Sequence, residues 1–107
     1  MSTDLSNIHL KGARIVRVIE DADQQRLTFE VSYPIIDGGS DFPRRKIIFQ
    51  ICSRYLVDET GMPGEPMIQR VEIAETGRPH RVTIRMHTDH GVREVTCYPS
   101  VLEESLQ

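Results

Sequence analysis

The sequence contains no tryptophan, few other aromatic residues and no long apolar run. A helix that spans a bilayer needs about 18 or more consecutive apolar residues, so this class of membrane protein is excluded. The first residues include Asp4 and lack a basic segment followed by an apolar stretch. We therefore expect no secretory signal, no membrane partner and a cytoplasmic location.

Cysteine is also scarce, with Cys52 and Cys97 the two examples. Neither belongs to a CxxC motif, which excludes the usual zinc-knuckle and thioredoxin patterns. Each falls in a strand-like apolar run, so we interpret both as reduced, buried core residues of a cytosolic protein. A disulfide between neighbouring strands is an alternative that sequence spacing alone does not decide.

Basic charge is in short supply, because 13 lysines and arginines face 16 aspartates and glutamates. A formal net charge of -3 argues against a general binder of nucleic acid. We interpret the short basic run 44–46 as the entry to a strand, where such charges discourage aggregation through a sheet edge. A homodimer that pairs through an edge strand at 44–52 is a further hypothesis.

Alternation of apolar and polar residues is the strongest pattern present. It is clearest in 27–33, where the odd positions are apolar: Leu27, Phe29, Val31 and Tyr33. Loops rich in glycine and proline are expected at 34–43 and 58–66, and no window shows a helical stripe. The pattern predicts an all-β fold, a single antiparallel β-sandwich or small β-barrel of about six to eight strands with little or no helix. A length of 107 residues fits one domain, 1–107, with room for loose ends at 1–6 and 104–107.

The segment 80–98 is predicted to be a hairpin, and its register can be derived from the side chains. A three-residue loop would place the carboxylate of Glu94 on the apolar face, which is costly. An even-numbered loop, at 89–90 or 88–91, sets Glu94 opposite Arg85 on the solvent face, where opposite charges are favourable neighbours. The other pairs expected in this register are Met86 with Arg93, Ile84 with Val95, Val82 with Cys97 and Thr83 with Thr96.

The same hairpin carries the most suggestive polar residues. Two imidazoles and a carboxylate, in His87, Asp89 and His90, have side chains of the kind that bind transition metals. No further ligand is identifiable, so we interpret the segment as an exposed turn and assign no metal. Arginines gather beside it and suit an acidic surface or a phosphate. The candidate binding residues are Arg81, Arg85, His87, Asp89, His90 and Arg93.

No catalytic residue and no cofactor is assigned, because the sequence lacks a nucleophile elbow and a phosphate-binding loop pattern. The leading hypothesis is a non-enzymatic cytoplasmic protein-interaction or accessory domain that meets a partner with an acidic surface. Its working surface would be the loops 34–43 and 58–66 or the arginine-rich hairpin. The alternative is a β-barrel that binds a small ligand or metal, with or without enzymatic activity, through the 87–90 turn and the barrel mouth.

Overall fold

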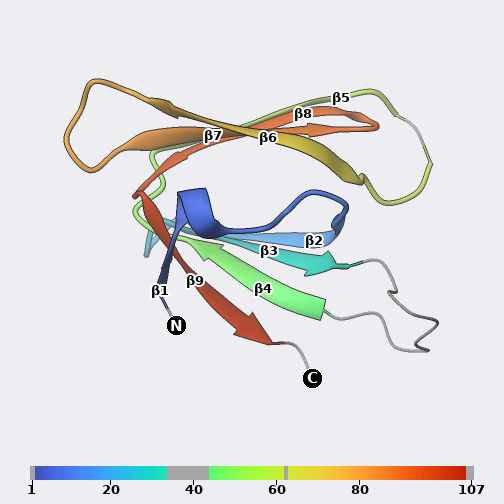
Figure 1. Cartoon of the computed structure of the whole chain (residues 1–107), viewed down its shortest axis with the longest axis horizontal. Helices are drawn as coiled ribbons and strands as arrows, with labels where there is room; N and C mark the ends of the chain where they lie inside the picture. The colour runs from blue at the N-terminus through green and yellow to red at the C-terminus, as the bar shows by residue number, and fades with distance from the viewer. Residues whose placement is uncertain (1, 34–43, 62, 106–107) are drawn as a thin grey trace.

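The computed structural model describes residues 2–33, 44–61 and 63–105, and strands dominate this part of the chain. They form two antiparallel sheets that lie one above the other (Figure 1). The five-stranded sheet has the order β1-β9-β4-β3-β2, and the four-stranded sheet has the order β5-β8-β7-β6. The strands are β1 (Ser2–Asp4), β2 (Arg14–Asp21), β3 (Arg26–Ser32), β4 (Arg44–Phe49), β5 (Arg54–Glu59), β6 (Ile68–Glu75), β7 (Val82–Thr88), β8 (Gly91–Cys97) and β9 (Ser100–Ser105).

The all-β prediction is confirmed, and the two stacked layers give a sandwich-like fold. The strands do not close into a barrel, because each sheet is an open row with two ends. The described helical structure is a single 3-10 turn, η1 (Leu5–Asn7). No helix among the described residues is long and apolar enough to cross a membrane.

The core lies between the two sheets and follows the period-two pattern of the sequence. In β3 the side chains of Leu27, Phe29 and Val31 are buried, as alternation requires of one face of a strand. Phe29 meets Phe49 and Tyr55 edge to face, at centroid distances of 5.3 and 5.8 Å, and so joins the two layers.

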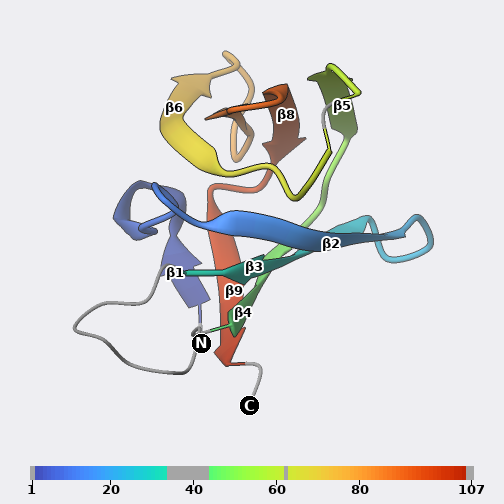
Figure 2. The same cartoon turned by 90° about the vertical axis from the view of Figure 1, so that its right-hand side faces the viewer.

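Two connections between the sheets run side by side, one from β4 to β5 and one from β8 to β9. β4 and β9 are paired in the five-stranded sheet. Their neighbours along the chain, β5 and β8, are paired in the four-stranded sheet. The crossing follows β4, where Ile51 has a φ of 51°. This left-handed conformation is rare for a β-branched residue and marks a sharp local bend. Figure 2 shows the chain passing between the layers at this end.

The hairpin of β7 and β8 has the predicted register. Arg85 is opposite Glu94 and Met86 is opposite Arg93, with the other three pairs also as derived. The loop is the two-residue connection Asp89-His90. The observed register therefore keeps the Glu94 carboxylate away from the apolar face.

Two sequence interpretations need correction. The strand at 44–52 is not an edge, because β4 lies between β3 and β9, so it has no free side with which to pair across a dimer. The predicted loop 58–66 begins later, because Asp58 and Glu59 are the last residues of β5, opposite Val92 and Gly91. The predicted loop 34–43 lies outside the described residues.

Candidate functional site

The candidate binding residues are distributed over two faces of the four-stranded sheet. Strand alternation sends Arg93 toward the other sheet and sends Arg85 and His87 to the outer face. His90 is buried, at 7% exposure, while Asp89 is exposed in the turn between the strands. The hairpin therefore does not present these residues as one surface.

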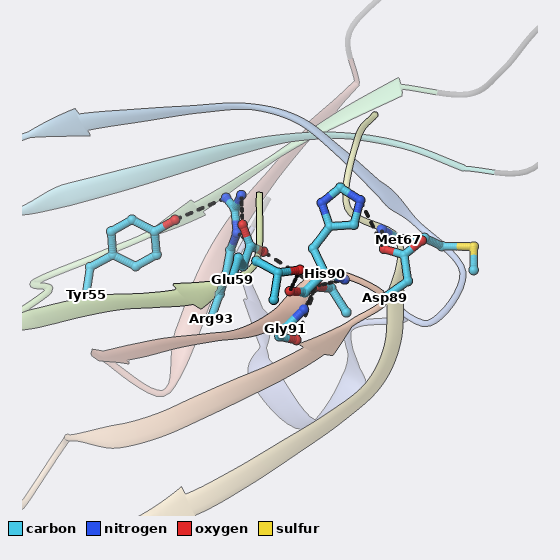
Figure 3. Close-up of polar contacts among 9 residues, drawn as sticks. Tyr55, Glu59, Met67, Asp89, His90, Gly91 and Arg93 are labelled. Carbon is cyan, nitrogen blue, oxygen red and sulfur yellow. Dashed lines mark hydrogen bonds and ion pairs between the residues drawn. The ribbon is translucent and has the colours of Figure 1, made fainter. Parts of the chain in front are cut away.

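A partly buried ion pair holds the inner face together near one end of β5 (Figure 3). The Arg93 guanidinium donates two hydrogen bonds of 2.8 Å to the Glu59 carboxylate and one of 3.2 Å to the Tyr55 hydroxyl. The exposed fractions are 14% for the Arg93 side chain and 12% for that of Glu59. Burial raises the pKa of Tyr55. Burial alone would lower the pKa of Arg93, but its bonds to Glu59 and Tyr55 outweigh it and the pKa is raised.

The turn after β7 is held by its own polar groups. The Thr88 hydroxyl oxygen accepts hydrogen bonds of 3.1 Å from the backbone N–H groups of His90 and Gly91. The Asp89 carboxylate accepts a hydrogen bond of 2.9 Å from the Met67 N–H, which fixes the turn to the start of β6. These contacts assign Asp89 a structural role, since its side chain is engaged by the fold itself (Figure 3).

The described residues contain no group of three or more histidine, cysteine, aspartate or glutamate side chains placed to hold a metal ion. The physical reason is clear for His87 and His90. His87 lies on the outer face and contacts Glu72, whereas the ring of His90 is buried and lies 3.7 Å from the Asp89 carboxylate. Their closeness in sequence does not bring them to one point.

The outer face carries a network of ion pairs. Arg85 donates hydrogen bonds of 3.2 and 3.0 Å to Glu94, its cross-strand neighbour. His87 and Arg70 both contact the Glu72 carboxylate. The hydrogen bond with His87 lowers the pKa of Glu72, with the charge of Arg70 adding to the effect. These charges are already engaged within the face and are poorly placed to recruit a partner.

A second set of arginines on this face is not engaged in this way. It surrounds a hollow of about 390 Å³, which we call the arginine pocket. Its lining residues are Ser53, Arg54, Thr76, Arg78, Arg81, Thr83, Glu94 and Thr96. Within the part of the chain that the structure describes, Arg54, Arg78 and Arg81 form no ion pair, while Glu94 is taken up by Arg85.

The fold brings the arginine pocket together from three separate segments. Arg54 begins β5 and is opposite Thr96 in β8. Arg78 and Arg81 lie in the turn between β6 and β7. Thr76 orders that turn, because its hydroxyl accepts a 3.2 Å hydrogen bond from the Arg78 N–H and donates one of 3.0 Å to the Arg81 carbonyl.

Of the sequence candidates, the arginine pocket therefore includes Arg81 and excludes the other five. Arg54 was not among the sequence candidates, because it is far from the hairpin along the chain and reaches the pocket through sheet pairing. Arg78 lies just before the predicted hairpin 80–98 but was not a sequence candidate either. Its role depended on the shape of the 76–81 turn, for which the sequence carried no signal beyond Gly77 and Pro79.

No protein-family model matches the chain, and comparison with the curated proteins and with the solved structures gives no match. The function must therefore be argued from the geometry and chemistry of the site itself.

Proposed function

We propose that this chain is a non-enzymatic protein-interaction domain whose arginine pocket binds an acidic segment of a partner protein. The observation that carries the proposal is the convergence of Arg54, Arg78 and Arg81 on one hollow, with no ion pair to any described residue. The chain has a formal net charge of -3, so this cationic site runs against its average charge.

The chemistry of the lining suits carboxylates. A guanidinium presents several N–H donors in a planar fork that matches a carboxylate in a two-point contact. The hydroxyls of Thr83 and Thr96, hydrogen-bonded to each other at 3.0 Å, border the same hollow and add polar contact sites. Guanidinium and hydroxyl groups together favour recognition of an anion over chemical conversion of it.

The surface next to the arginine pocket favours a protein segment over a small anion. A neighbouring hollow of about 330 Å³ shares Glu94 with the pocket, and Leu56 and Val92 line it together with Asp58, Arg85 and His87. Leu56 is 43% exposed, a large fraction for a leucine in a strand. Protein interfaces combine apolar contacts of this kind with a charged rim. A segment with carboxylates followed by an apolar side chain would fill both hollows.

The proposal is tested by selecting peptides from a randomised library on the wild-type domain and measuring the selected peptides by fluorescence anisotropy. We expect enrichment of aspartate and glutamate beside apolar residues, and binding that weakens with added salt. The double variant Arg78→Gln with Arg81→Gln should bind about tenfold more weakly or worse.

Lys11→Gln with Arg14→Gln is the matched control, because it removes the same number of positive charges at exposed sites. Arg14 lies beside Met67, at the opposite end of β6 from the arginine pocket. The control variant should therefore bind the selected peptide with the affinity of the wild type. Selection without acidic enrichment, or equal binding by the double variant and the wild type, would overturn the proposal. Saturable binding of inorganic phosphate in place of any peptide would point to a small-anion site instead.

A further inference from the structure

The two cysteines meet at the bend where the paired strands cross between the sheets. The Tyr98 N–H donates to the Gln50 carbonyl at 3.0 Å, and the Ser53 N–H donates to the Thr96 carbonyl at 2.9 Å. Between these two hydrogen bonds, Ile51 and Cys52 stand opposite Cys97 alone. This two-against-one arrangement is that of a β-bulge. It places Cys52 opposite Cys97, and the titration of each thiol depends on the other.

The two thiols differ in their access to solvent. Cys97 is fully buried, with 0% exposure, in the core cluster. Cys52 is half-buried and lines a hollow of about 260 Å³ that Gln25 and Tyr55 also border. A small reagent that enters this hollow therefore reaches Cys52 first, while Cys97 lies behind it.

The environments of the two thiols also give them different pKa values. The hydrogen bond from Cys97 lowers the pKa of the Cys52 thiol, and the positive charge of Arg81 acts in the same direction. The same hydrogen bond, together with burial, raises the pKa of Cys97. Cys52 is thus the thiol that ionises first, and the thiolate is the nucleophilic form of cysteine.

We propose that Cys52 and Cys97 are a redox-active pair that forms an intramolecular disulfide on reaction with a small disulfide such as oxidised glutathione. In the first step the Cys52 thiolate attacks one glutathione sulfur. The S–S bond of the reagent breaks, and one glutathione leaves as a thiolate that takes up a proton. Cys52 is then joined to the other glutathione in a mixed disulfide.

In the second step the Cys97 sulfur attacks the Cys52 sulfur as the Cys97 proton passes to the departing glutathione. The bond between Cys52 and glutathione breaks, and the second glutathione leaves and is protonated. Two protein thiols are oxidised and one small disulfide is reduced to two thiols. Consumption of the Cys52 thiolate removes the negative charge that held the proton on Cys97, so the first step prepares the second.

The test treats the native, reduced protein with oxidised glutathione and follows intact mass over time. The wild type should pass through a transient single-glutathione adduct, mapped to Cys52 by peptide analysis. It should end with the loss of two hydrogens and no retained glutathione. Cys97→Ala should stop at the adduct, and Cys52→Ala should remain unmodified while folded, because Cys97 is buried.

An unfolded sample provides the control for reactivity, because both thiols should react there at similar rates. The inference is overturned if the wild type retains glutathione as its final product, if it forms disulfide-linked dimers, or if Cys52→Ala reacts as fast as the wild type. Should Cys97→Ala fail to fold, the time course and mapping of the wild-type adduct decide the question. Arg78→Gln alone leaves both cysteines and the charge of Arg81 in place, so failure of peptide binding and failure of disulfide formation are separate results.

Discussion

Substitution of Arg93 by methionine tests whether this candidate binding residue stabilises the fold. The change removes the guanidinium and leaves the Glu59 carboxylate, 12% exposed, with a 3.5 Å contact from the Thr88 hydroxyl as its remaining hydrogen bond to a described residue. Breaking a fully buried ion pair by removing one partner costs about 3–5 kcal/mol. Because both side chains here retain slight exposure, we expect about 3 kcal/mol, a large share of the stability of a small domain.

The assay is chemical and thermal unfolding, with a fall in Tm of about 12 °C for a loss of about 3 kcal/mol in a domain of this size. Arg85→Met is the matched control, because it makes the same change on the outer face of the same hairpin. The Arg85 and Glu94 side chains are 50% and 23% exposed, so breaking that pair should cost less than about 1 kcal/mol.

A double variant completes the test of Arg93. Combining Arg93→Met with Glu59→Leu removes both charges, and the double variant should regain most of the lost stability. Equal costs for Arg93→Met and Arg85→Met would refute the reasoning. A stable Arg93→Met protein that had lost affinity for the acidic peptide would assign Arg93 to binding instead.

Two further results are expected from other parts of the same sheet. Gly91→Ala should destabilise the protein by about 3 kcal/mol or more, because an added Cβ would lie 2.1 Å from the Asp58 carbonyl oxygen at a φ of 148°. Gly61→Ala, which meets no atom within 4 Å, should leave the unfolding midpoint unchanged and serves as its control. Replacing His87 by phenylalanine should raise the pKa of Glu72 toward its ordinary value, as read from its carboxyl resonance in an NMR titration. Because the pKa of Glu72 is lowered in the folded protein, its contact with His87 stabilises the fold at pH values above the ordinary pKa of a glutamate. This contribution is lost as the pH falls through the pKa of the folded state. An unchanged Glu72 titration in the variant would contradict the contact.

Much of the fold could be predicted because the side-chain pattern and the burial it demands are local. The alternation in β3 set which residues face the core, and the charge of Glu94 set the register of the β7–β8 hairpin. A one-residue slip would have moved every side chain to the wrong face, so the physical penalty itself carried the information. The order of strands in each sheet had no such local signal.

The candidate site was less predictable, because it depends on neighbours that are distant in sequence. Arg85 and Arg93 were grouped as one positive cluster, yet the strand sends them to opposite faces and each meets its own carboxylate. Arg54 and Arg81 join one hollow only because β5 pairs with β8 and the 76–81 turn closes beside them. Charge in a sequence does not show which charges are already neutralised.

The sequence by itself determined that this chain has an all-β fold, since only strands satisfy its period-two pattern. It also determined the register of one hairpin, through the cost of burying a carboxylate. The tertiary structure alone decided that Cys52 and Cys97 lie opposite each other and that three arginines converge without described ion partners. Both depend on how two sheets bend and cross, a property of long-range packing that no short stretch of residues encodes.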